Sequence, residues 1–174
     1  MGKFNTNRTE KTGGFFRNIG NVKAQQSTRY EEAGHYIMRV ECIKQGESRK
    51  GVDFIAIEKT VLQVIDNEVI NPITLEKSVG HRKGEEVTHM IMMDKDAAMP
   101  EFKSTLIALS GDDEEAITEE VCDMVVSDEQ PLAGLVVEMV NTLVKTKSGG
   151  LFTKKNYKRV LTPQEVEELD KADG

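Results

Sequence analysis

An alternation of apolar and polar side chains limits the fold of this chain more than any other feature. Between positions 35 and 44 every second residue is apolar, and this set is Tyr36, Met38, Val40 and Cys42. A period of two residues is typical of a β-strand with one buried face. After a turn at 45–48, residues 51–65 are rich in β-branched side chains and predict a second long strand. We therefore expect a β-rich domain that begins with a hairpin of two long strands.

The apolar residues of the second strand change parity part-way along it. Ile55 and Ile57 share one parity, whereas Leu62 and Val64 share the other. A β-bulge near residues 58–60 would account for this change, because one extra residue turns the following side chains to the opposite face. Such a bulge would also bend the strand around the corner of a barrel.

A third strand and a helical insertion follow. The strand covers residues 85–93, after a polar connection at 67–83. Apolar residues then repeat at helical spacing up to Gly111, which stands where a C-terminal cap belongs. A second helix can begin at Asp112-Asp113, so we expect the helical insertion to cover about residues 98–127.

The chain ends with a second hairpin and an acidic segment. Strands at 135–144 and 151–161 flank a loop, 145–150, with two glycines for positive-φ positions. Residues 162–165, Thr-Pro-Gln-Glu, then fit a helix start, with threonine as N-cap, proline in the first turn and glutamate closing a capping box. We expect residues 162–174 to form a short acidic helix or tail.

Charge is distributed unevenly along the chain, although its net charge is only -7. Residues 1–29 contain six basic residues and one acid, and residues 145–159 contain six basic residues and no acid. Acidic residues gather at 112–129 and 165–173. Such segregation is typical of proteins that bind nucleic acid. We interpret the polar segment 1–33 as an extended basic arm.

Five strands with a helix between the third and the fourth give the layout of the OB-fold, a small barrel. Three segments resemble phage-encoded single-stranded DNA-binding proteins of the OB type: Gly34-His35-Tyr36, the turn KQGESRKG, and the terminal hairpin TLVKTKSGGLFTKKNYKRV with the LTPQEV that follows it. The resemblance covers about residues 34–165. Two features depart from it: the arm is longer and more basic than the fold needs, and the tail lacks the terminal phenylalanine that recruits partners in many such proteins.

The resemblance implies both a fold and a function. The fold is mainly β, a five-stranded OB-fold-like barrel over residues 34–161 with strand order β-β-β-α-β-β. The function is sequence-independent binding of single-stranded DNA in phage DNA replication or recombination, in the host cytoplasm. Acidic regions would recruit replication or recombination proteins. The alternative is a structural or assembly protein, virion-associated or an oligomeric scaffold, whose arm reaches a neighbouring subunit of a homo-oligomer.

Binding of single strands without sequence preference needs cations for phosphates and aromatic rings for bases. The terminal hairpin offers both, and we predict DNA contacts from Lys145, Lys147, Phe152, Lys154, Lys155, Tyr157, Lys158 and Arg159. Lys155, Tyr157 and Arg159 have the same parity, so the ring would lie between two cations on one face. The competing interpretation is a lysine-rich edge strand that prevents aggregation. Six cations without an acid exceed what that protection needs.

Further candidates lie in the first hairpin and in the arm. Those of the first hairpin are Arg39, Lys44, Arg49, Lys50 and Lys59. They alternate with glutamates, so a solvated face explains them equally well. Phe15 and Arg17 of the arm could contact DNA or a neighbouring subunit.

Catalysis has little support in the sequence. The three histidines lie in separate segments without metal-ligand spacing, and no glycine-rich phosphate loop joins a strand to a helix. We therefore expect no catalytic residue, no metal and no cofactor. Cys42 and Cys122 lie in apolar patterns and are expected to be buried free thiols in a reducing cytoplasm. No apolar run approaches the roughly 20 residues of a transmembrane helix, so we expect no membrane association.

Overall fold

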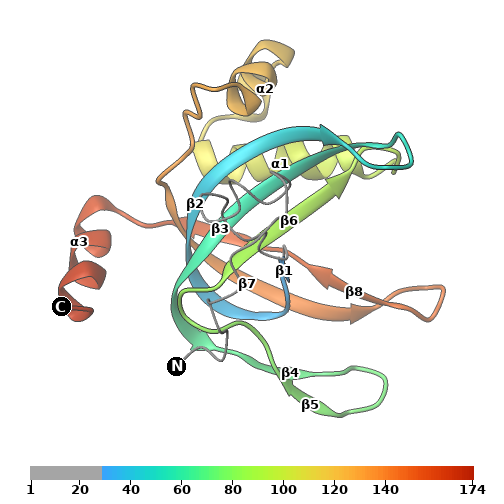
Figure 1. Cartoon of the computed structure of the whole chain (residues 1–174), viewed down its shortest axis with the longest axis vertical. Helices are drawn as coiled ribbons and strands as arrows, with labels where there is room; N and C mark the ends of the chain where they lie inside the picture. Colours follow the sequence, from blue (N-terminus) through green and yellow to red (C-terminus); the bar gives the residue numbers. More distant parts are fainter. Residues whose placement is uncertain (1–28) are drawn as a thin grey trace, which may run out of the picture.

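Two long strands, β2 (Gly34–Glu47) and β3 (Asp53–Asp66), pair antiparallel at the centre of the sheet in a computed structural model that describes residues 29–174 (Figure 1). Strand β6 (Glu86–Met92) pairs antiparallel with β3, and β7 (Val136–Lys145) pairs antiparallel with β2. The sheet curls into a half-barrel, and the fold is mainly β, as expected from the period-two patterns.

Short strands extend this sheet at both edges. They are β1 (Arg29–Tyr30), which pairs parallel with β6, and β8 (Leu151–Lys154) and β9 (Tyr157–Val160), which both pair with β7. A separate two-stranded hairpin consists of β4 (Glu68–Ile70) and β5 (Lys77–Val79). The sequence did not predict β1, β4 or β5, and the single strand expected at 151–161 is divided at Lys155-Asn156.

The register between β2 and β3 shifts three times. One shift lies opposite the predicted bulge, but the extra residue is Glu41 of β2, because Val40 pairs with Lys59 and Cys42 with Glu58. The extra residues of β3 itself follow later, at Leu62 and Ile65. Bulges increase twist and bend a strand, which accounts for the curl of this sheet.

Helix α1 (Ala98–Ser110) packs against the sheet and buries Phe102, Leu106 and Leu109 in the main core. It ends at Gly111, whose φ of 72° confirms the predicted C-cap. The next helix differs from the expectation. A short 3₁₀ turn, η2 (Glu114–Ala116), precedes α2 (Glu119–Val126), whose N-cap is Thr118 rather than Asp112 or Asp113.

Helix α3 (Pro163–Ala172) begins with the predicted capping box. The Thr162 hydroxyl accepts a hydrogen bond from the Glu165 backbone N–H, and the Glu165 carboxylate accepts one from the Thr162 N–H. Val166 and Leu169 pack on a small second core of Ile37, Val136 and Leu161. No helix in the described part of the chain is long and apolar enough to cross a membrane.

Residues 29–33 belong to the folded domain, although the sequence suggested an arm up to residue 33. The Glu31 backbone N–H donates to the Thr88 carbonyl at 3.0 Å, which continues the contact of β1 with β6. The side chains of Glu31 and Ala33 are buried. The rest of the predicted arm, including Phe15 and Arg17, lies outside the described residues.

Candidate nucleic-acid interface

The β7–β8 hairpin projects from the half-barrel (Figure 1). Strand β7 extends beyond the end of its neighbour β2. The last β2–β7 pair is Gly34 with Asn141, and residues 142–145 of β7 pair only with β8. The turn is closed by a hydrogen bond from the Thr146 N–H to the Gly150 carbonyl at 2.8 Å, and Gly149 has a φ of 89°. This confirms the predicted hairpin and leaves both its faces accessible near the tip.

An aromatic ring and four lysines gather on this hairpin. Phe152 is 46 % exposed, and the Lys155 Nζ lies 5.3 Å from the centroid of its ring. The remaining lysines are exposed: Lys145, Lys147 and Lys154. Among the described residues none of the four lysines forms an ion pair. A solvent-facing ring beside unneutralised cations is the combination that single strands require.

The Lys158 and Arg159 side chains, in contrast, are neutralised by local acids. The Glu138 carboxylate accepts from Lys158 at 3.3 Å and from Arg159 at 2.8 Å, and Arg159 also contacts both oxygens of Glu165 at 2.8 and 2.9 Å. The hydrogen bond with His35, supported by these two cations, lowers the pKa of Glu138 to about 2. These two cations therefore belong to an ion-pair network that joins β7, β9 and α3.

Tyr157 points into the half-barrel and does not lie between Lys155 and Arg159 on an exposed face, as its parity suggested. Its hydroxyl accepts a hydrogen bond from the Lys59 Nζ at 2.7 Å and lies 2.9 Å from the His89 Nδ1. Burial raises the pKa of Tyr157 well above its usual value. The ring is therefore not presented to a base in this structure.

Lys59 is also internal, and its side chain is 0 % exposed. Its Nζ lies 2.6 Å from the Glu31 Oε2 and 4.2 Å from the centroid of the Tyr157 ring. Burial lowers the pKa of Lys59. Burial alone would raise the pKa of Glu31, but Lys59, His89 and the Asn141 hydrogen bond together outweigh it and lower that pKa. Because its charge is paired inside the half-barrel, Lys59 is not available to a phosphate, and the sequence prediction for this residue is corrected.

One signal of this internal network is visible in the sequence. Lys59 has the parity of its buried neighbours Ile57 and Val61, which places it on the inner face. The Glu31 partner gave no signal, because it stands in a polar segment. The network continues from His89, whose Nε2 lies 2.7 Å from a Glu101 carboxylate oxygen and whose pKa is lowered by burial.

The other candidates of the first hairpin lie away from β8. Arg39 pairs with Glu41 at 2.8 Å, and Lys44 pairs with Glu58. Arg49 and Lys50 are exposed in the turn between β2 and β3. The structure therefore does not bring these four residues together with the β7–β8 hairpin.

Among residues 29–174 no group of three or more His, Cys, Asp or Glu side chains could hold a metal ion. Cys42 and Cys122 are free and only half-buried, and burial together with the Glu58 carboxylate raises the pKa of Cys42 to about 11.

Of the predicted site residues, the structure gathers five on one projecting element: Lys145, Lys147, Phe152, Lys154 and Lys155. Comparison with known proteins adds no further candidate. The sequence matches no protein-family model, and no curated protein matches it. A functional assignment therefore depends on the chemistry of the hairpin.

Proposed function

We propose that this protein binds single-stranded DNA without reading its sequence, through the β7–β8 hairpin. The observation that carries the proposal is the exposed Phe152 ring with the Lys155 ammonium beside it. A base stacked on such a ring contributes about 1–3 kcal/mol. Lys145, Lys147 and Lys154 lie within the same hairpin and supply the phosphate contacts.

The connectivity of the sheet supports an OB-fold-like barrel. Strands β2, β3 and β6 form an antiparallel meander, α1 follows, and β7 returns antiparallel to β2. In such a barrel the β7–β8 hairpin would correspond to the last hairpin. OB-folds commonly bind oligonucleotides, so we propose a role in phage DNA replication or recombination, in the host cytoplasm.

The distribution of acidic residues is compatible with this role. Helix α3 carries four acids against one lysine and lies on the side of the molecule opposite the β7–β8 hairpin (Figure 1). Its negative charge is therefore kept away from a strand bound at Phe152. We propose that acidic surfaces of this kind contact replication or recombination proteins.

The proposal is tested by fluorescence anisotropy with a labelled oligo-dT, at about 50 and about 200 mM salt. We expect micromolar or tighter affinity at the lower concentration and a steep decrease at the higher one, because displaced counterions account for much of the binding free energy. Absence of binding at low salt would overturn the proposal.

One observation favours the alternative, a structural or assembly protein. The β4–β5 hairpin exposes four large apolar side chains, with Leu75 73 % exposed: Ile70, Ile73, Leu75 and Val79. Exposed apolar patches often mark contacts between subunits. Light scattering of the wild type and of Ile73→Ser/Leu75→Ser distinguishes the two functions. An oligomer that the substitutions dissociate, together with no affinity for DNA, supports assembly.

A further inference from the structure

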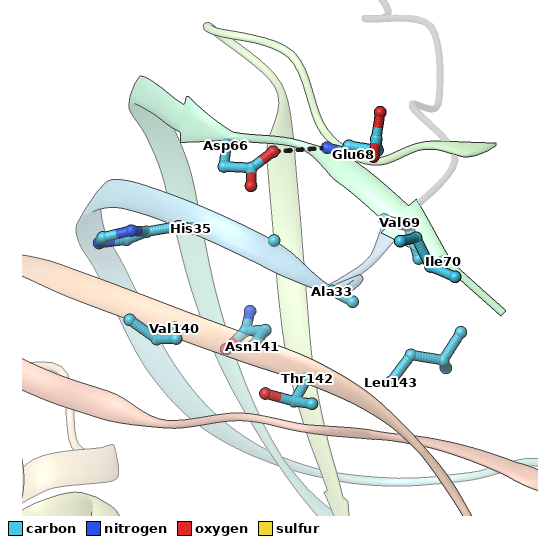
Figure 2. Close-up of a pocket in the computed structure, with 11 residues that line it drawn as sticks. Ala33, His35, Asp66, Glu68, Val69, Ile70, Val140, Asn141, Thr142 and Leu143 are labelled. Carbon is cyan, nitrogen blue, oxygen red and sulfur yellow. Dashed lines mark hydrogen bonds between the residues drawn. The ribbon is translucent and has the colours of Figure 1, made fainter. Parts of the chain in front are cut away.

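A cleft of about 400 Å³ separates the β4–β5 hairpin from β7 (Figure 2). One wall comes from Ala33 and from His35 at the start of β2, and another from Val69 and Ile70 of β4. The floor is formed by residues 140–143 of β7. This volume falls within the range of roughly 300–1,000 Å³ that is usual for sites of small organic molecules.

The side chains around the cleft suit an uncharged, flat ligand. Val69, Ile70 and Leu143 supply apolar contact surface, and the Asp66 carboxylate lies at the rim, whereas the Glu68 side chain points away from the cleft (Figure 2). No lysine or arginine of the described chain lines it. A phosphate would therefore be repelled, whereas a nucleobase could fill the apolar part and donate a hydrogen bond to the Asp66 carboxylate.

The cleft is continuous with the proposed interface. Thr142 lines the cleft and is the cross-strand partner of Lys154, and Phe152 is the partner of Val144, two residues further along β7. Side chains of directly opposed residues lie on the same face of an antiparallel pair. A strand held by Lys154 and Phe152 thus passes the mouth of the cleft.

We propose that this cleft receives one base of the bound strand and prefers bases with an exocyclic amino group, such as cytosine, over thymine. This inference rests on the proposed function and adds to it a base preference at one position of a strand that is otherwise bound without regard to sequence. Asp66 Oδ1 already accepts a hydrogen bond from the Glu68 N–H at 2.9 Å, which leaves its second oxygen free for an amino group. Glu68 is held at the surface by Lys77, 3.2 Å from its Oε1. Thymine has no amino group, and its one donor on this edge, the N3–H, lies between two carbonyl oxygens that repel the Asp66 carboxylate.

The test compares the affinities of oligo-dC and oligo-dT of equal length for the wild type and for Asp66→Asn/Glu68→Gln. The ratio of the two dissociation constants is the quantity of interest, because intrinsic differences between the oligonucleotides cancel when the variant is compared with the wild type. A hydrogen bond to a charged acceptor predicts that the preference for oligo-dC falls by about tenfold in the variant. Asp112→Asn/Glu115→Gln removes the same charges near η2 and should leave the preference unchanged.

The outcomes separate the two proposals. Salt-dependent binding of both oligonucleotides, with the same preference in wild type and variant, overturns the cleft inference and leaves the proposed function intact. Failure of the wild type to bind either oligonucleotide overturns both. A preference lost in Asp66→Asn/Glu68→Gln but kept in Asp112→Asn/Glu115→Gln supports the cleft as a base-binding site.

Discussion

The Nζ of Lys59 lies 2.6 Å from the Oε2 of Glu31, and both side chains are fully buried inside the half-barrel. This ion pair attaches residues 29–33 to β3, and Asn141 of β7 reinforces it with a hydrogen bond to the Glu31 Oε1 at 2.8 Å. It therefore connects the segment that follows β1 with β3 and β7.

Removal of one partner should be costly. We expect Lys59→Met to lower the free energy of unfolding by about 3–5 kcal/mol, because the Glu31 carboxylate remains buried without its counter-ion. Urea unfolding followed by circular dichroism measures this change. The double variant Glu31→Leu/Lys59→Met should regain much of the loss, since no buried charge remains. A double variant less stable than Lys59→Met would contradict this account.

The buried position of Lys59 also predicts that its side chain does not contact DNA. Folded Lys59→Met protein should bind oligo-dT with an affinity and a salt dependence close to those of the wild type, because the ammonium is internal. A reduced salt slope would instead show that Lys59 reaches the DNA, as the sequence alone suggested.

The Phe152 ring should carry the stacking contribution. We expect Phe152→Ala to weaken oligo-dT binding by about 1–3 kcal/mol, measured by fluorescence anisotropy. Its neighbour Leu151 is similarly exposed, at 44 %, and lies in the same strand, so Leu151→Ala is the matched control. Equal losses in the two variants would indicate that general hairpin contacts, and not stacking, are responsible.

The lysines of the hairpin should determine the salt dependence. For Lys154→Gln/Lys155→Gln we expect the slope of log affinity against log salt to become shallower by about 1.4, or about 0.7 for each lost phosphate contact. Lys171→Gln provides the control, because Lys171 pairs with Glu167 on α3. An unchanged slope in the hairpin variant would move the phosphate contacts to another surface.

The ion pairs around Glu138 should contribute to the free energy of unfolding, and this contribution should decrease at acidic pH. The pKa of this group is about 2 in the folded protein and 4.5 ordinarily, so the unfolded chain takes up the proton first as the pH falls. The stabilisation is complete above about pH 4.5 and is lost as the pH approaches 2. The stability difference between wild type and Glu138→Gln, measured by urea unfolding, should therefore narrow from pH 6 to pH 3. A constant difference would contradict this assignment.

The elements predicted best are those whose signals are local. The capping box at Thr162 and the C-cap at Gly111 depend on neighbouring residues, and both occur where expected. The change in apolar parity along β3 is also a local signal. It predicted the register shift at residues 58–60, although the extra residue lies on β2. A parity change identifies where two strands lose register but not which strand contains the extra residue.

The candidate site was predicted less completely, because charge pairing depends on distant residues. Lys59 and Tyr157 were assigned to DNA from their chemical type, yet they contact each other across 98 positions inside the half-barrel. Arg159 meets Glu138 and Glu165 for the same reason. Phe152 and Lys155 are only three residues apart, and this local pair was the part of the site that sequence could identify.

Photo-crosslinking with an oligonucleotide that carries 5-iododeoxyuridine tests the central claim most directly, because the excited base reacts with an aromatic ring on which it stacks. Mass spectrometry of the digested complex identifies the crosslinked residue. We predict a dominant crosslink at Phe152, which is lost in Phe152→Ala and retained in Leu151→Ala. The absence of any crosslink, or crosslinks confined to elements other than the β7–β8 hairpin, would contradict the proposal that this hairpin binds single-stranded DNA.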